Sequence, residues 1–157
     1  MMIETIQVFD LDGVLADSSH RYQLGADGKI DLEHWRYHSD KVFCDSVLPT
    51  AEVYKEGLQA DNIATIIATA RVWCQQSTAW VIENLGPPDQ LIYRLGDDDT
   101  RGGALLKIAG IKPLLDLPKY SNVQKIEVFE DNADYLKAIC DALPNSIGHY
   151  IPSEQGH

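Results

Sequence analysis

Carboxylate side chains follow two apolar runs that lie far apart in the chain. Asp10 and Asp12 stand within VFDLDGVLAD, and Glu130 and Asp131 stand within KIEVFEDN. Residues two apart on an extended chain point to the same side, so we expect Asp10 and Asp12 to face one another. Like charges at short range repel, and burial adds a desolvation cost. The pair therefore requires a nearby cation.

Magnesium and a phosphate ester fit this requirement. Carboxylate oxygens are hard ligands that Mg²⁺ takes, and Asp10 and Asp131 could supply them and relieve the repulsion. Thr69, which ends another apolar run, and Lys107 offer a hydroxyl and a flexible charge to phosphate oxygens. With the phosphate neutralised, one carboxylate can attack phosphorus to form an aspartyl-phosphate. A second can protonate the leaving oxygen and later activate water.

The elements that must position these residues follow an α/β pattern. Five apolar runs predict buried strands at residues 6–11, 63–69, 90–95, 125–130 and 147–151. Helical patterns separate most of them, at residues 48–60, 75–86, 100–111 and 132–143. This alternation predicts a three-layer, Rossmann-like fold with a parallel sheet. The carboxyl ends of parallel strands share one edge, so residues some 120 apart in sequence are expected to meet there.

Capping residues and apolar positions indicate where the helices begin and end and which of their side chains are buried. Thr100 and Asn132 are the predicted N-caps, Pro49 marks a helix start, and Gly86 marks a helix end. The expected core side chains on the first two helices are Val53, Leu58, Trp80, Val81 and Leu85.

One segment interrupts the alternation. Residues 17–46 are polar, with a turn at Gly25–Gly28 and a short helical piece at Leu32–Tyr37. About 30 residues is long for a plain loop in a compact domain. We therefore predict a single domain over residues 1–157, in which residues 17–46 form a small cap over the strand ends.

Composition narrows the class of protein. The 157-residue chain carries a net charge of −11, which disfavours extended binding to nucleic acid. It has no apolar stretch long enough for a membrane span and no secretion signal at its start. The three scattered cysteines, Cys44, Cys74 and Cys140, suggest neither a disulfide framework nor a zinc knuckle. We expect a cytoplasmic protein.

The four motifs together resemble those of the haloacid dehalogenase (HAD) superfamily. Its DxDG[TV] signature stands as Asp10-Leu11-Asp12-Gly13-Val14, its hydroxyl residue as Thr69, its lysine as Lys107 and its acidic pair as Glu130-Asp131. The resemblance implies that Asp10 is the nucleophile and that Asp12 is the general acid/base, with its backbone carbonyl on Mg²⁺. It implies that Thr69 and Lys107 hold the phosphoryl group and that Asp131 is a direct metal ligand. Glu130 is either a further ligand or a partner of the ligands.

A narrower resemblance is to the 3′-phosphatase domain of phage polynucleotide kinase and its stand-alone relatives. It is carried by short pieces between residues 6 and 135: FDLDGVLAD, HRY, DLEHW, ATAR, STAWV, and YR before DDDTRGGALLK. The sequence departs from that pattern at Gly102 and Gly103, where acidic residues are common, and at Glu130, where aspartate is commoner.

Some residues admit two interpretations. We predict that Arg71 and Arg101 contact phosphate, with a surface ion pair as the alternative. His34 and His38 have the spacing of a metal pair on a helix, but no third ligand is evident and packing is favoured. Cys74 has no partner at a recognisable spacing and is expected to be a small buried hydrophobe.

The sequence thus predicts a Mg²⁺-dependent phosphomonoesterase. The expected substrate is a small phosphorylated molecule, either a nucleotide or the 3′-phosphorylated end of a nucleic acid. Two alternatives remain: a phosphatase for a non-nucleotide metabolite, and a non-catalytic binding module that keeps the fold. Intact Asp10 and Asp12 argue against the module.

Overall fold

A five-stranded parallel sheet forms the centre of the molecule in the computed structural model, which describes residues 2–21, 23–29 and 31–153. The strand order is β5-β4-β1-β6-β7, and every neighbouring pair is parallel. The strands are β1 (Thr5–Phe9), β4 (Ile63–Val72), β5 (Gln90–Arg94), β6 (Lys125–Glu130) and β7 (Ser146–Tyr150). The predicted α/β fold with a parallel sheet is confirmed.

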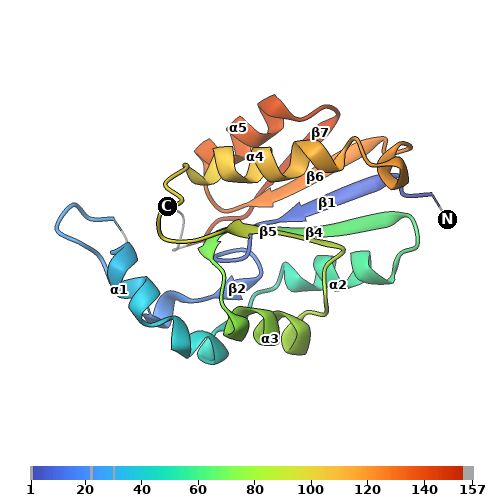
Figure 1. Cartoon of the computed structure of the whole chain (residues 1–157). Coiled ribbons are helices and arrows are strands. Elements are labelled where there is room, and N and C mark those ends of the chain that lie inside the picture. Colours follow the sequence, from blue (N-terminus) through green and yellow to red (C-terminus); the bar gives the residue numbers. More distant parts are fainter. Residues whose placement is uncertain (1, 22, 30, 154–157) are drawn as a thin grey trace.

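Two helical layers enclose the sheet (Figure 1). One face is covered by α2 (Ala51–Gln59) and α3 (Gln75–Asn84), and the other by α4 (Gly103–Leu114) and α5 (Ala133–Ala142). A short 3₁₀ helix, η3 (Pro118–Tyr120), follows α4. Each layer has its own apolar core, because side chains alternate along a strand: Phe9 packs into one core, and Ile6 and Val8 pack into the other.

The strand order indicates where a ligand would bind, at the carboxyl ends of the strands beside β1. From β1 the chain passes to β4 and β5 on one side, and later to β6 and β7 on the other. Ligands of open parallel sheets bind at the carboxyl ends of the strands where the chain direction reverses in this way. Here that point lies between β1 and β6, whose residues pair from Thr5 with Lys125 to Phe9 with Phe129.

Residues 17–46 begin and end at a small antiparallel ladder. Its strands are β2 (Ala16–Asp17) and β3 (Ser46–Val47). Between them lie η1 (Ser19–Arg21), α1 (Leu32–Tyr37) and η2 (Ser39–Cys44), and the predicted turn closes through a bond from the Gly28 N–H to the Gly25 carbonyl. Figure 1 shows α1 beyond the carboxyl ends of the sheet, on the side of α3. The role of this segment as a cap stays a prediction.

The first strand ends earlier than predicted, at Phe9 rather than Leu11. Beyond it the chain folds into tight turns, in which the Leu11 carbonyl accepts hydrogen bonds from Val14, Leu15 and Ala16. Gly13 has a φ of 86°, which favours glycine. The Asp10–Asp12 segment is therefore not extended, and the expectation that the two carboxylates face one another loses its geometric basis.

Two helix predictions are also corrected. Thr100 is not the N-cap of α4, because Gly102 holds that position. The buried Arg94 donates to the carbonyls of Asp99 and Arg101 and so keeps this segment out of the helix. Val53 is not a core residue: it is 36% exposed, whereas its neighbour Tyr54 is buried and donates to the Gly86 carbonyl.

The other helix signals hold. Trp80, Val81 and Leu85 are buried, and Leu58 packs partly buried against the same core. Asn132 caps α5, since its side chain accepts a hydrogen bond from the Tyr135 N–H.

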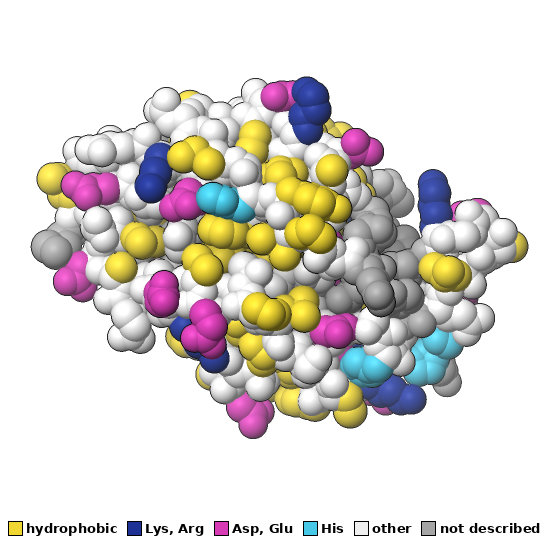
Figure 2. Space-filling model, turned by 180° about the vertical axis from the view of Figure 1, so that it is seen from behind, with side chains coloured by type: hydrophobic (Ala, Val, Ile, Leu, Met, Phe, Trp, Pro, Cys, Tyr) yellow, Lys and Arg dark blue, Asp and Glu magenta, His cyan; other side chains and the backbone are white. Residues whose placement is uncertain are grey.

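One face of the molecule carries its basic side chains in a scattered way (Figure 2). On the face seen in Figure 2, the described Lys and Arg side chains lie singly among acidic and apolar ones and form no continuous band. In the described part of the chain, no helix combines the length and the hydrophobicity that a membrane span requires.

Candidate active site

Lys107 joins the ends of β1 and β6. Its ammonium donates to Asp10 Oδ1 at 3.0 Å and to Glu130 Oε2 at 2.6 Å. All three side chains are buried, and Lys107 reaches the strand ends from the first half of α4. The structure thus brings together residues that are 97 and 23 positions apart in the sequence.

Asp131 completes a group of three carboxylates. One oxygen each from Asp10, Glu130 and Asp131 lies within 4.8 Å of the others, and all three residues are buried. Ser153 donates to Asp131 Oδ2 at 2.9 Å. The chain passes very close to this group at Gly13, where a Cβ atom would lie 2.1 Å from Asp131 Oδ2. Glycine is therefore required at this position for steric reasons as well as for its φ angle.

Glu130 and Asp131 have strongly raised pKa values. Burial, together with the charge of Asp10, raises the pKa of Glu130 to about 9, although Lys107 opposes the change. Burial and Asp10 likewise raise the pKa of Asp131 to about 7, against the hydrogen bond from Ser153. Burial disfavours the charged Lys107, but Asp10 and Glu130 more than compensate and raise its pKa. A divalent cation fits this donor set, because it would let all three carboxylates ionise together.

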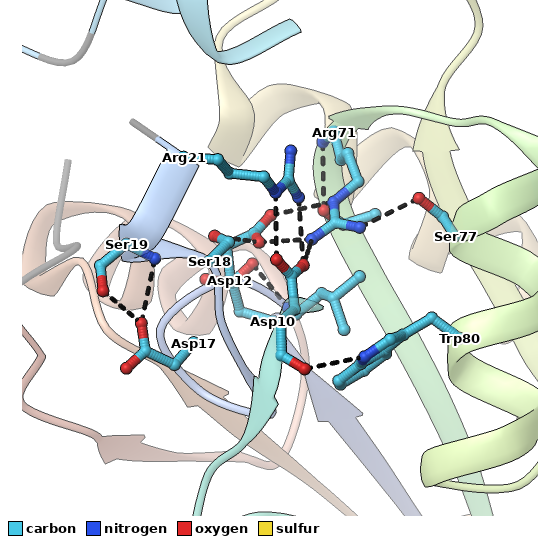
Figure 3. Close-up of polar contacts among 12 residues, drawn as sticks. Asp10, Asp12, Asp17, Ser18, Ser19, Arg21, Arg71, Ser77 and Trp80 are labelled. Atoms are coloured by element: carbon cyan, nitrogen blue, oxygen red, sulfur yellow. Dashed lines mark hydrogen bonds and ion pairs between the residues drawn. The ribbon is translucent and has the colours of Figure 1, made fainter. Parts of the chain in front are cut away.

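The Asp12 carboxylate is paired with the guanidinium of Arg71 and not with Lys107. Its carboxylate accepts bonds from Arg71 Nη2 at 2.6 Å, Arg71 Nε at 3.2 Å and Ser18 Oγ at 2.8 Å (Figure 3). Burial alone would raise the pKa of Asp12, but Arg71, Arg21 and Ser18 hold it below its usual value. Asp10 and Asp12 thus each have a basic partner of their own, Lys107 and Arg71.

Arg71 is a buried residue rather than part of a surface ion pair. Its guanidinium also donates to Ser77 Oγ at 3.0 Å and to Asp45 Oδ2 at 3.3 Å. Burial lowers the pKa of an arginine, but Asp12 and Asp45 keep that of Arg71 above its ordinary value. In this structure Arg71 therefore neutralises protein carboxylates, and a contact with phosphate stays a prediction.

Asp45 and Arg21 were not predicted from the sequence as site residues. Arg21 makes two bonds of 3.1 Å to the Asp45 carboxylate, and His20 Nε2 lies 2.7 Å from its Oδ1. Trp80 Nε1 donates to the Asp45 backbone carbonyl at 3.0 Å, which fixes this residue against α3. A lone aspartate near the end of a polar segment gives no sequence signal. For Arg21, the only sequence signal was its place in the HRY piece of the narrower resemblance.

Thr69 and Arg101 lie in different surroundings. Thr69 is buried near the end of β4, and its hydroxyl accepts a hydrogen bond from the Arg71 N–H. It follows Ile67, which pairs with Phe9, so it lies at the same sheet edge as Asp10. Arg101 is exposed and pairs with Asp99 at 2.8 Å, as the surface alternative expected. Its predicted phosphate contact is untested.

Among the described residues, neither the histidine pair nor Cys74 belongs to a group that could hold a metal ion. The rings of His34 and His38 lie 4.2 Å apart, but the described residues show no third ligand with them. Cys74 is partly buried beside the core at the start of α3, with its sulfur 3.3 Å from Ser77 Oγ. It is therefore less buried than predicted, and its role as a small hydrophobe stays a prediction.

Replacing Asp45 by asparagine should damage the site without touching Asp10. The change leaves Arg21 and Arg71 buried with one carboxylate fewer, and breaking a buried pair costs about 3–5 kcal/mol. For a chain of this size we expect thermal unfolding to begin about 6–20 °C lower. Differential scanning calorimetry measures the shift.

Asp31→Asn is the matched control for this prediction. Asp31 lies in the same segment and its carboxylate accepts a hydrogen bond from the His34 N–H. Asparagine can accept the same hydrogen bond and caps helices about as well as aspartate, so we expect a Tm close to that of the parent. Equal shifts for the two variants would contradict the role given to Asp45.

Similar folds occur in solved structures of other proteins. The HAD domain of the effector protein Lem4 from Legionella pneumophila is 10% identical, with a TM-score of 0.62 over 98% of this chain and 89% of that one. A chain of the Pnkp1/Rnl/Hen1 complex is 16% identical, with a TM-score of 0.65 over 96% of this chain. The present chain spans 46% of it, less than half its length. At these identities the likeness concerns the fold.

The fold is the one found in a HAD domain, as the sequence motifs predicted, and three buried carboxylates stand near its strand ends. The model of the bacteriophage T5 5′-deoxynucleotidase family matches residues 1–83, which is more than half of the 157-residue chain. The chain belongs to this family. A comparison with curated proteins finds no match. The matched region includes Asp10, Asp12 and Thr69 and ends before Lys107 and Asp131.

Proposed function

We propose that the chain is a Mg²⁺-dependent phosphomonoesterase that acts through a phosphorylated Asp10 and hydrolyses deoxynucleoside 5′-monophosphates. The observation that carries this proposal is the buried group of Asp10, Glu130 and Asp131 with Lys107 at the ends of β1 and β6. A nucleophile, a basic side chain and a set of hard oxygen ligands stand within one site.

The metal would be held by this chain's carboxylates. Asp10 and Asp131 are the proposed direct ligands, with the backbone carbonyl of Asp12 as a third. Glu130 already accepts a bond from Lys107 at 2.6 Å, which suits a residue that supports the ligands. When bound, Mg²⁺ supplies positive charge that neutralises phosphate oxygens.

The reaction then needs two steps. In the first, an Asp10 carboxylate oxygen forms a bond to phosphorus, the ester P–O bond breaks, and the leaving oxygen takes a proton from Asp12. In the second, the Asp12 carboxylate takes a proton from water, the water oxygen bonds to phosphorus, and the Asp10–phosphorus bond breaks. Arg71 stabilises Asp12 as a carboxylate, which is the form that the second step uses. The first step uses the protonated form, so in this proposal Asp12 takes up a proton from solvent, against the effect of Arg71, before the ester bond breaks. Thr69 and Lys107 are the proposed contacts of the phosphoryl group.

The preference for mononucleotides rests on the family and on charge. The family is named for a 5′-deoxynucleotidase. A net charge of −11 disfavours the binding of a long polyanion, and the face seen in Figure 2 shows no continuous basic band. The 3′-phosphorylated nucleic-acid end that the narrower resemblance suggested is kept as the competing substrate.

A panel of phosphate esters tests the proposal. We would measure phosphate release from deoxynucleoside 5′-monophosphates, 3′-phosphorylated oligonucleotides and sugar phosphates, with Mg²⁺ and with a chelator. The highest kcat/KM is expected for the 5′-monophosphates, and only with Mg²⁺. Turnover of sugar phosphates alone would establish a metabolite phosphatase, and no turnover at all would contradict the proposed enzyme.

Metal binding should also show itself as a pH-dependent gain in stability. The pKa values of Asp131 and Glu130 are raised from 3.8 and 4.5 to about 7 and about 9. The folded state therefore binds more protons than the unfolded state in this window, and without metal its stability falls as the pH rises. Mg²⁺ binds the ionised form, so its stabilising effect should grow from pH 5 to pH 8.

Thermal unfolding with and without Mg²⁺ at the two pH values checks this prediction. Asp131→Asn, which removes one charge and keeps the size of the side chain, should abolish most of the Mg²⁺-induced rise in Tm. A rise that is equal at pH 5 and pH 8, or unchanged in Asp131→Asn, would remove Asp131 from the metal site.

A further inference from the structure

A cavity opens beside Arg71, the partner of Asp12. It has a volume of about 180 Å³ and lies between residues 17–46 and the end of β4 with the start of α3. Its lining includes Arg21, Trp35, Arg71, Trp73, Ser77 and Asp97. Two tryptophans and two arginines therefore contribute to one small cavity.

This cavity is linked directly to the proposed general acid. Arg71 lines it and, through the same guanidinium, binds both oxygens of Asp12. A general acid must reach the leaving oxygen within hydrogen-bond distance, or through one water. The leaving group of the substrate therefore departs on the side of Asp12, next to the cavity that Arg71 borders.

Trp73 presents a ring that is already held in place. Its indole Nε1 donates to Thr78 Oγ1 at 2.8 Å, and its ring lies 5.7 Å from that of Tyr93. Trp35 differs, because the guanidinium of Arg21 lies over its ring at 4.5 Å from the centroid. Trp73 is thus the lining residue best placed to offer an aromatic surface without losing an arginine contact.

The size of the cavity restricts its ligand. Pockets for drug-sized ligands have volumes of about 300–1,000 Å³. A cavity of about 180 Å³ suits one planar ring system rather than several nucleotides. Ser77 and Asp97 add polar groups to the lining, as expected of a site that orients a heterocycle.

We infer that this cavity binds the base of the leaving nucleoside, with Trp73 as its stacking surface. The inference rests on the proposed function and names a specificity site for it. It makes the enzyme prefer a phosphate ester that carries an aromatic base over one that carries the sugar alone.

The test compares two substrates that share the same phosphate ester. We would measure kcat/KM for deoxyadenosine 5′-monophosphate and for 2-deoxyribose 5-phosphate, and use their ratio, which cancels general damage to the enzyme. Base stacking contributes about 1–3 kcal/mol per base, so Trp73→Leu should lower the ratio by at least about 5-fold. Trp73→Phe, which keeps an aromatic ring, should retain most of it.

Two further variants complete the design. Cys74→Phe fills the cavity from its lining and should also lower the ratio, which keeps the test valid if Trp73→Leu does not fold. Tyr150→Leu removes an aromatic ring from β7, at the opposite edge of the sheet from β5, and should leave the ratio unchanged.

The outcomes separate this inference from the proposed function. If the parent enzyme hydrolyses the nucleotide but the ratio is the same in Trp73→Leu and Cys74→Phe, the base site is wrong and the proposed function stands. If the parent hydrolyses neither substrate, the proposed function fails. Calorimetric titration of Asp10→Asn with deoxyadenosine 5′-monophosphate then decides the base site alone. Affinity lost on adding Trp73→Leu supports it, and no binding or no loss overturns it.

Discussion

Replacing Asp10 by asparagine is expected to lower kcat by on the order of 10³-fold or more, because the amide is a poor nucleophile toward phosphorus. Asp10 stands directly after β1 and touches Lys107 at 3.0 Å. The change keeps the size of the side chain, so the fold should persist. Steady-state rates with a deoxynucleoside 5′-monophosphate measure the effect.

The control for this prediction is Asp17→Asn. Asp17 accepts bonds from Ser19 at the base of residues 17–46 and is not among the three clustered carboxylates. We expect kcat to stay within a few fold of the parent value. Near-normal turnover by a folded Asp10→Asn protein would contradict the account of Asp10 as nucleophile.

Replacing Lys107 by methionine should damage both stability and catalysis. The change leaves Asp10 and Glu130 buried without their shared cation, and removal of one partner from a buried pair costs about 3–5 kcal/mol. It also removes the proposed phosphate contact, for which we expect kcat/KM to fall by on the order of 10²-fold or more. Denaturant unfolding and steady-state kinetics measure the two effects separately.

Lys137→Met is the matched control for Lys107→Met. Lys137 forms an exposed ion pair with Asp141 at 2.6 Å on α5. Such pairs contribute little, so stability and rate should both stay near the parent values. If Lys107→Met unfolds at the same denaturant concentration as Lys137→Met, the buried ion pairs of Lys107 do not stabilise the protein as proposed.

The fold was accessible from the sequence because its signals are local. Apolar runs such as KIEVFE have the length of buried strands, and the observed β6 spans the same residues, Lys125–Glu130. Asn132 at the start of a helical pattern is a cap signal, and it caps α5. The error at Thr100 arose where a side chain outside the helix decides the local structure. Arg94 holds the carbonyls of Asp99 and Arg101, and no local pattern reveals this.

The candidate site also has a part that could be predicted from the sequence and a part that could not. Asp10, Lys107 and Asp131 could be placed together because parallel strands end at one edge, and the structure does bring them together. The partners of Asp12 could not be foreseen. Its pairing with Arg71 depends on the turn after β1 and on the end of β4, and Asp45 joins from residues 17–46. Such three-dimensional pairing leaves no spacing pattern in the sequence.

The most direct test of the central claim is to detect the phosphoryl group on Asp10. In Asp12→Asn the first step can still proceed with an aryl phosphate, whose leaving group needs no proton, while the second step lacks its base. We would mix this variant with an aryl phosphate and Mg²⁺, quench in acid, and analyse the peptides by mass spectrometry. The account predicts the added mass of one HPO₃ group on Asp10, removable by hydroxylamine and absent in the variant that also carries Asp10→Asn. Burst release of the aryl alcohol without any adduct on Asp10, or with an adduct on another residue, would contradict it.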